Sequence, residues 1–248
     1  MFKKKKEPNE INKKLQEPVI ANNVVFMNKE DVIKHYMKPE VVEGITKFIG
    51  DANVMVNRFF DGQMVIQKKI DNRPIKIKET GHDLDNPNNY YYYVPRHTVE
   101  FHYIYPEKSH HVTIDIDPNN VPFSKAKEVT KHLYNYLSDK VDGKMGVRYS
   151  GGRGFYITVY HDKPVDVNEY RKRLTKIFEP IVEKVDFLTL KPPQEGQIRI
   201  DLSTMHEGGS IRAPYSLHAE TGLVSVPVDI KKIDVFNPLK DAHPRIKR

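Results

Sequence analysis

Two aspartates in one short stretch have residue types and a spacing that suit binding of a divalent metal ion. From His111 to Pro118, apolar and polar residues alternate, which predicts a β-strand with one buried face. Asp115 and Asp117 then project together from the other face, about 7 Å apart along the strand. Carboxylates this close repel each other unless a cation lies between them. The simpler alternative is that both acids are solvated at the end of a surface strand.

A second stretch, residues 197–202, repeats this pattern and adds a third carboxylate. Its isoleucines and leucine form one face, while Arg199 and Asp201 share the other. If the two strands are neighbours in a sheet, Asp115, Asp117 and Asp201 converge on one patch. Three carboxylates are a minimal metal site for phosphoryl transfer, so the pattern predicts metal-assisted phosphoryl chemistry.

A glycine-rich turn could supply the other half of such a site. Two strands are predicted to be connected by Ser150, Gly151, Gly152, Arg153 and Gly154. Glycines let backbone N–H groups approach an anion closely, and the guanidinium of an arginine matches phosphate oxygens. By itself, a glycine-rich segment of this kind is usually only a turn. Beside three carboxylates, it predicts a triphosphate site in which metal ions hold one side of the phosphates and the backbone amides and Arg153 hold the other.

Two further residues, Arg212 and His218, follow Asp201 closely enough in the sequence to fold back over the same site. Taken singly, Arg212 also fits a surface ion pair, and His218 also fits an ordinary loop position. Both alternatives stay open at this point.

Helices and strands must position these residues, and the hydrophobic periodicity predicts where they lie. Asn28 and Ser124 are predicted helix N-caps. Asp61 and Gly62 predict a hairpin turn between two strands. The order lacks strict βαβ regularity, which favours an α+β fold with a mixed sheet over a doubly wound parallel one. The predicted helices are residues 28–37, 40–49, 124–138 and 168–185, and the predicted strands are residues 54–60, 64–68, 75–78, 90–93, 98–105, 111–118, 146–150, 155–161, 197–202 and 223–228.

The composition is that of a globular chain with a basic balance. The 248 residues carry a formal net charge of +7, which favours a polyanionic partner such as nucleic acid. There is no cysteine, which excludes disulfides and thiolate zinc sites, and we expect no zinc. No apolar run approaches the roughly 18 residues of a membrane span, so we expect a cytoplasmic protein without a membrane partner. We predict a flexible basic arm over residues 1–18 and a single domain over 19–248, with an N-terminal module (19–105) and a metal-binding core (106–235).

Several motifs follow one another in a fixed order: Asp115-x-Asp117, Ser150-Gly-Gly-Arg153-Gly, Asp201, Arg212-x-Pro214-x-Ser216-Leu217-His218 and Thr221-Gly222-Leu223. In this order they resemble the motifs of the archaeo-eukaryotic primase superfamily, and the resemblance covers about residues 30–245. The closest branch is the catalytic small subunit of archaeal DNA primase, whose final segment is similar to residues 236–242 here. The polymerase domain of bacterial end-joining ligases is a sister branch, which residues 31–36, 58–62, 67–68, 100–102 and 213–216 resemble.

The resemblance implies a primase-polymerase fold with an RRM-like catalytic core and two bound divalent ions, Mg²⁺ or Mn²⁺. It implies that these ions are held by Asp115, Asp117 and Asp201. It further implies that the incoming nucleotide contacts Ser150, Gly151, Gly152, Arg153, His218, Arg212, Lys68 and His102. The chain departs from the family pattern twice. Tyr156 occupies the position where the second motif ends in a histidine, and the cysteine-rich zinc knuckle of archaeal small subunits is missing.

The implied activity is template-directed nucleotidyl transfer, as in the catalytic subunit of a DNA primase. Its partners would be a DNA template and primer, nucleoside triphosphates and a primase large subunit, and the protein would be associated with the nucleoid. An end-joining gap-filling polymerase, working with a ligase and an end-binding protein, is the alternative within this class. Tyr156 also leaves open a non-catalytic nucleic-acid binder. A metal-dependent nuclease would not need the glycine-rich turn, so it is less favoured.

Overall fold

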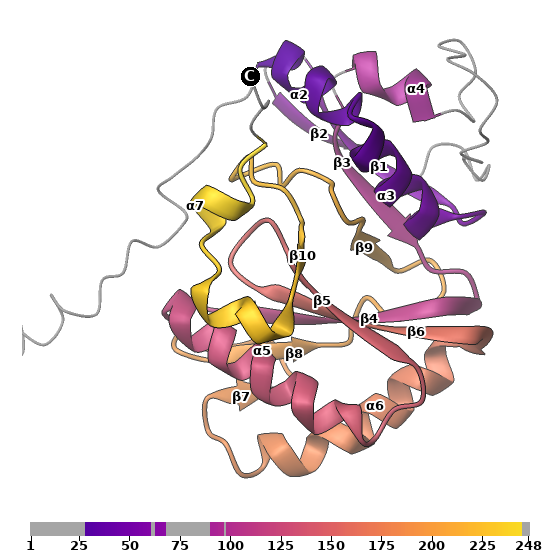
Figure 1. Ribbon diagram of the computed structural model, residues 1–248. Coiled ribbons are helices and arrows are strands. Elements are labelled where there is room, and N and C mark those ends of the chain that lie inside the picture. Colours follow the sequence, from indigo (N-terminus) through magenta and orange to yellow (C-terminus); the bar gives the residue numbers. More distant parts are fainter. Residues whose placement is uncertain (1–27, 61–62, 68–89, 97, 245–248) are drawn as a thin grey trace, which may run out of the picture.

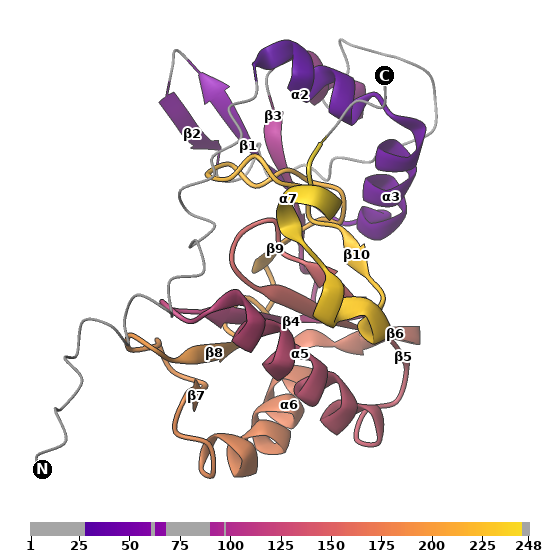
Figure 2. The ribbon, with the colours of Figure 1, turned by 60° about the vertical axis from the view of Figure 1, so that its left-hand side comes forward.

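Two β-sheets lie one above the other, with helices on the outer side of each (Figures 1 and 2). The computed structural model describes residues 28–60, 63–67, 90–96 and 98–244. Helices α5 and α6 pack against the six-stranded sheet, and α2 and α3 lie beside the four-stranded sheet. The predicted α+β class is confirmed. The helices are α2 (Lys29–Tyr36), α3 (Pro39–Ile49), α4 (Tyr90–Tyr93), α5 (Phe123–Ser138), α6 (Val167–Val182) and α7 (Pro238–Asp241), with 3-10 helices η2 (Val94–Arg96) and η3 (Ile230–Val235).

The larger sheet has the strand order β10-β5-β6-β4-β8-β7. Its neighbours are antiparallel except for the parallel pair β7 and β8, so the sheet is mixed, as predicted. The central strand β4 shows the expected alternation: Ile114 and Ile116 are fully buried, whereas Asp115 and Asp117 are partly exposed. The strands are β4 (Lys108–Pro118), β5 (Lys144–Tyr149), β6 (Phe155–Asp166), β7 (Leu188–Thr189), β8 (Ile198–Asp201) and β10 (Pro227–Val228).

The smaller sheet has the strand order β2-β1-β3-β9, and its last strand comes from late in the chain. The predicted hairpin is confirmed by the antiparallel pairing of β1 with β2, in which Phe60 lies opposite Gln63. Because β9 pairs with β3, the two sheets do not correspond to two consecutive halves of the chain. The predicted domain boundaries stay a prediction. The strands are β1 (Val54–Phe60), β2 (Gln63–Gln67), β3 (Thr98–Ile104) and β9 (Ser210–Arg212).

The prediction of a strand at the tyrosine run was wrong. Residues 90–93 form the short helix α4, followed directly by η2. Tyr90 and Tyr93 are buried, and a spacing of three residues places both on one side of a helix. The ring of Tyr90 stacks on Phe101 of β3 with centroids 5.0 Å apart. Packing against the sheet therefore outweighed the strand propensity of tyrosine.

Two other boundaries also differ from the predictions. Helix α5 begins at Phe123, and Pro122 rather than Ser124 occupies its N-cap position, without a side-chain cap. Proline has no capping hydroxyl, but its fixed φ is compatible with the entry of the chain into the helix. The predicted strand at 223–228 is reduced to an isolated bridge at Val224 and the two residues of β10. In contrast, Asn28 caps α2 as predicted, accepting from the backbone N–H of Asp31 at 2.9 Å.

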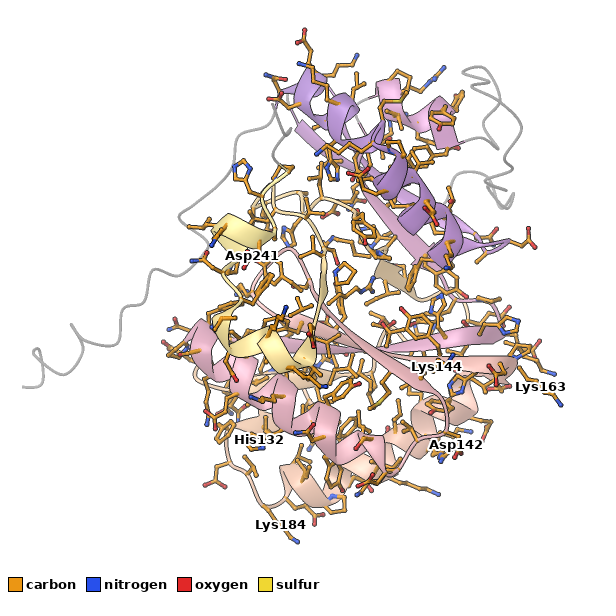
Figure 3. All side chains as sticks on the ribbon, viewed as in Figure 1. His132, Asp142, Lys144, Lys163, Lys184 and Asp241 are labelled. Carbon is orange, nitrogen blue, oxygen red and sulfur yellow. The ribbon has the colours of Figure 1, made fainter. Side chains whose placement is uncertain are left out.

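Several predicted features fall outside the described residues: the N-terminal segment 1–18, the turn residues Asp61 and Gly62, and the strand at 75–78. Exposed side chains such as His132, Asp142 and Lys184 lie at the periphery of the helical layer (Figure 3). Within the part of the chain that the structure describes, no helix combines the length and apolar character that a membrane span requires.

Two buried histidines are expected to make the fold acid-sensitive. Burial lowers the pKa of His35 and of His111 to about 4 from an ordinary value of 6.5. Between pH 6.5 and 4, the unfolded chain binds protons that the native protein excludes. The free energy of unfolding should therefore fall as pH decreases through this window, by up to about 3 kcal/mol per histidine.

Urea denaturation at a series of pH values measures this loss. The His35→Asn variant should show a shallower pH dependence than the wild type, whereas His132→Asn, which changes an exposed histidine, should not. An unchanged slope for the His35 variant would contradict the assignment.

Candidate active site

Strands β4 and β8 bring the three predicted carboxylates onto one face of the larger sheet. The strands are antiparallel neighbours, with Asp115 directly opposite Asp201. In the same register, Asp117 lies opposite Arg199. Residues that lie directly opposite each other on neighbouring antiparallel strands have Cα atoms about 4.5–5.5 Å apart, and their side chains project from the same face of the sheet. The predicted adjacency of the two aspartate-bearing strands is therefore confirmed.

The carboxylates at this site repel one another. Burial, followed by the charges of Asp117 and Asp201, raises the pKa of Asp115 to about 8. Burial also raises the pKa of Asp117, although Arg153 acts in the opposite direction. Asp115 therefore resists ionisation until a cation compensates the repulsion.

Arginines supply part of that compensation. Nη1 of Arg199 lies 2.8 Å from Oδ2 of Asp201. Nη2 of Arg153 lies 3.6 Å from Oδ1 of Asp117. With side chains in these positions, no group of three or more histidine or acidic side chains within the described ranges is gathered tightly enough to hold a metal ion. The donor types nevertheless fit Mg²⁺ or Mn²⁺, which prefer carboxylate oxygens, and the mutual repulsion of the carboxylates is what such an ion removes.

The glycine-rich turn between β5 and β6 is organised around Ser150. Its Oγ accepts from the backbone N–H of Gly152 at 3.2 Å and of Gly154 at 3.3 Å. Gly151 has φ of +89°, a left-handed conformation that favours glycine. A Cβ on Gly154 would lie 1.9 Å from the carbonyl oxygen of Ile116, so this glycine lets the turn pack directly against β4. The turn is thereby held beside the aspartate-bearing strand.

Gly154→Ala is expected to destabilise the protein by more than about 2 kcal/mol, because backbone must move to admit the methyl group. Gly146→Ala is the matched control: its Cβ would lie 3.5 Å from the ring of Tyr160, an ordinary contact. The control should change the free energy of unfolding by less than about 1 kcal/mol. Chemical denaturation of both variants measures the difference, and equal stabilities would refute the close packing.

His218 lies against the same turn. A Cβ on Gly152 would be 2.8 Å from Nε2 of His218, and one on Gly151 would be 3.0 Å from its Cβ. Burial, followed by the charge of Arg212, lowers the pKa of His218 to about 4. The imidazole is therefore neutral near pH 7 and offers hydrogen bonds rather than charge.

A buried carboxylate, Glu100 on β3, connects the smaller sheet to this region. Its Oε1 accepts from Nη2 of Arg212 and from the backbone N–H of Ala219, each at 2.8 Å. Its Oε2 lies 3.1 Å from Nε2 of His102 and also accepts from the side-chain amide of Asn57. Although burial raises the pKa of Glu100, Arg212 and His102 hold it well below its usual range. Glu100 is thus an ionised carboxylate that joins strands β1, β3 and β9 and the segment at Ala219 through its hydrogen bonds.

Arg212 carries the connection across to the larger sheet. It lies opposite His102 in the pairing of β9 with β3. Its Nη1 donates to the carbonyl oxygen of Ser150 at 2.9 Å and lies 3.5 Å from the hydroxyl of Tyr156. Two residues predicted to contact the nucleotide, Arg212 and His102, are therefore joined to the glycine-rich turn by one network.

A row of side chains crosses the larger sheet through the site. Arg148 on β5 lies opposite Tyr156 on β6. Tyr156 lies opposite Asp115 on β4, and Asp115 lies opposite Asp201 on β8.

Sequence reasoning missed Glu100 and Arg148 as members of the site. The usable signal for Glu100 was the alternation in β3, which places three polar residues on one face of a buried strand. Lys68, another predicted nucleotide contact, lies outside the described residues.

Comparison with known proteins bears on the fold and on the family of the chain. In solved structures, the chain resembles the polymerase domain of Mycobacterium tuberculosis ligase D in complex with DNA, with a TM-score of 0.69 and 17% sequence identity. The match covers 90% of this chain and 89% of that one, and it shows a shared fold. An uncharacterized protein of Methanocaldococcus jannaschii is 28% identical over an alignment of 159 residues, which covers 60% of this chain and 35% of that protein.

A family model provides the assignment. The model of the LigD primase-polymerase domain matches residues 28–246, nearly the whole chain. This match confirms the resemblance to the polymerase domain of end-joining ligases. It does not show the expected closer relation to the small subunit of archaeal primase. The chain belongs to the LigD primase-polymerase domain family of nucleotidyltransferases.

Proposed function

We propose that the protein adds nucleotides to the 3′ end of a nucleic-acid primer on a DNA template, using two divalent ions. The observation that carries the proposal is the register that sets Asp115 opposite Asp201 beside the glycine-rich turn. Acidic and phosphate-binding groups are thereby close neighbours, as phosphoryl transfer requires.

Asp115, Asp117 and Asp201 would hold Mg²⁺ or Mn²⁺. When bound, the ions supply charge neutralisation of the triphosphate and activation of the 3′-hydroxyl. The ion pairs of Arg199 and Arg153 keep the carboxylates compensated in the free protein and leave these arginines available to phosphate oxygens afterwards.

The chain's own residues would then mainly bind and orient the nucleotide. Arg153 is exposed at the tip of the turn and suits contact with a phosphate. His218 adds a neutral hydrogen-bonding group against Gly151 and Gly152. Arg212, fixed by Glu100, supplies positive charge behind the turn. Positioning and electrostatic stabilisation of this kind account for most of the catalysis in phosphoryl transfer.

DNA is the proposed template and primer partner. The net charge of +7 suits a polyanion, and the ligase D polymerase domain of similar fold was solved in complex with DNA. Binding should weaken steeply as salt rises, because phosphate contacts release counterions.

Primer extension tests the proposal. A labelled primer annealed to a longer DNA template is incubated with single nucleoside triphosphates and Mn²⁺ or Mg²⁺. We expect incorporation of the nucleotide complementary to the template and little of the other three. DNA binding without incorporation would instead support a non-catalytic nucleic-acid binder, which the uncharged Tyr156 in the second motif favours.

Two biological roles fit this chemistry. The family match favours gap filling during end joining, with a ligase and an end-binding protein as partners. The motif order and the segment 236–242 favour priming beside a primase large subunit, in a nucleoid-associated complex. Synthesis on single-stranded DNA with no primer supplied identifies a primase. A preference for gapped duplexes with a recessed 5′-phosphate identifies the end-joining role.

A further inference from the structure

We propose that Arg148, together with the hydroxyl of Tyr156, binds a phosphate group of the incoming nucleotide and forms an additional anion site at the back of the active site. This inference rests on the proposed function and extends it to residues outside the glycine-rich turn.

Arg148 is a buried cation whose polar atoms are unsatisfied. The residue is 5% exposed, and its Nε, Nη1 and Nη2 atoms have no hydrogen-bond partner among the residues that the structure describes. Burial lowers the pKa of Arg148, but a guanidinium stays protonated in proteins. Leaving such a charge unpaired is strongly unfavourable, so a native protein rarely keeps one without a use.

Aromatic rings hold the guanidinium by its flat faces. Its central carbon lies 4.8 Å from the ring centroid of Phe48 and 4.4 Å from that of Tyr156. Cation–π contacts stabilise the charge but use the faces of the group, whereas its N–H bonds point outward in the plane. The stacked arginine therefore keeps its N–H donors unpaired, although burial hides them from solvent in the free protein.

The position of Arg148 connects it to the phosphate-binding region. Tyr156 lies between Arg148 and Asp115 in the row that crosses the sheet. The hydroxyl of Tyr156 lies 3.5 Å from Nη1 of Arg212, which itself donates to Ser150. Nε of Arg212 is also buried without a partner in the described part of the chain. Two guanidinium groups with free donors thus flank one tyrosine.

The nearby carboxylates do not satisfy these donors. Glu100 already accepts from Arg212, Asn57 and Ala219 and contacts His102. Asp115 is two strands away and accepts no hydrogen bond from Arg148. An external anion with several acceptor oxygens, such as a phosphate, matches the unused donors.

The site also accounts for the tyrosine in the second motif. A phenol at position 156 cannot carry a positive charge at any pH, and burial, which raises its pKa to about 12, also disfavours the phenolate. Arg148, stacked on that ring, supplies the charge from the adjacent strand. Because Arg148 is almost fully buried in the free protein, we expect its side chain to turn toward the hydroxyl of Tyr156 when the nucleotide binds.

The test compares ligands that differ in phosphate content. Binding of a nucleoside triphosphate, of the matching monophosphate and of single-stranded DNA is measured by calorimetry in Mn²⁺ without a primer. Arg148→Gln should weaken triphosphate binding by about 10–100-fold, the effect of losing hydrogen bonds to a charged group. Its affinity for DNA should change by less than about 2-fold, and its affinity for the monophosphate should fall much less than that for the triphosphate.

Arg173→Gln is the matched control, because Arg173 also stacks on a tyrosine, Tyr170, but is exposed on α6. It should bind all three ligands as the wild type does. Adding Tyr156→His to Arg148→Gln should restore part of the triphosphate affinity, which a purely structural role of Arg148 does not predict. If Arg148→Gln does not fold, the same binding measurements are made on Arg148→Lys, which keeps the positive charge but loses the planar arrangement of N–H donors.

Several results would overturn the site. Triphosphate binding at wild-type strength in a folded Arg148 variant would do so, and so would equal losses for triphosphate and DNA, which would point to a backbone-phosphate or structural role. The outcome is separable from that of the proposed function. If the wild type binds triphosphate through Arg148 but does not extend a primer, the polymerase proposal fails and the anion site stands.

Discussion

Replacing both Asp115 and Asp117 by asparagine is expected to lower the rate of primer extension by on the order of 10³-fold, which corresponds to about 4 kcal/mol of transition-state stabilisation. The amides keep the shape of the side chains but remove the negative charges that would hold divalent ions. The fold should survive, because the change removes two carboxyl groups that are unfavourable in the free protein: burial, followed by the charges of Asp117 and Asp201, raises the pKa of Asp115 to about 8.

Two measurements accompany the rate. In the wild type, Mn²⁺ should raise the melting temperature, because an ion that binds only the native state stabilises it. In the double variant, this increase should be absent. Asp142→Asn, a change in the exposed turn between α5 and β5 (Figure 3), serves as the control and should leave both readouts unchanged. Extension at a near wild-type rate by the double variant would remove the two-metal proposal.

Glu100→Gln has the second-largest expected effect and acts on the network behind the glycine-rich turn. The side chain of Glu100 is 4% exposed and pairs with Arg212 at 2.8 Å. Loss of its charge leaves the guanidinium of Arg212 buried without a counter-ion, which costs about 3–5 kcal/mol for pairs of this kind. Nucleotide affinity should fall as well, because Arg212 and the backbone at Ala219 lose their shared anchor.

Urea denaturation and nucleotide titration measure these two losses. Glu128→Gln is a suitable control, since Glu128 is exposed and pairs with Lys125 on the surface at 3.0 Å, where such pairs contribute less than about 1 kcal/mol. The double variant Glu100→Gln, Arg212→Met closes a mutant cycle and should show a coupling of more than about 2 kcal/mol. Additive effects would show that the two residues act independently.

The local parts of the site could be predicted from the sequence because they depend on short-range patterns. The alternation in residues 111–118 fixes which side chains share a face, and the structure retains it: Ile114 and Ile116 are buried, opposite to Asp115 and Asp117. Gly151, Gly152 and Gly154 likewise predicted the turn from a short stretch of sequence. The structure and the family match agree with the fold class that these patterns indicated.

The missing parts depend on contacts between distant segments. Glu100 and Arg212 are separated by more than a hundred positions, and nothing in either local pattern identifies the other as its partner. Arg148 looked like one basic residue in a predicted strand, because its unusual feature is the lack of a partner after folding. The tyrosine run was mispredicted for a related reason: the stacking of Tyr90 on Phe101 is a tertiary contact that propensity does not contain.

The late position of β9 has a consequence for synthesis of the protein. His102 and Arg212 become neighbours only after the ribosome has added the 110 residues that follow His102, up to and including Arg212. Until then, one edge of β3 presents unpaired backbone groups and Glu100 lacks its counter-ion. A chain truncated before Ser210 would therefore expose an unpaired edge strand, and such an edge favours self-association.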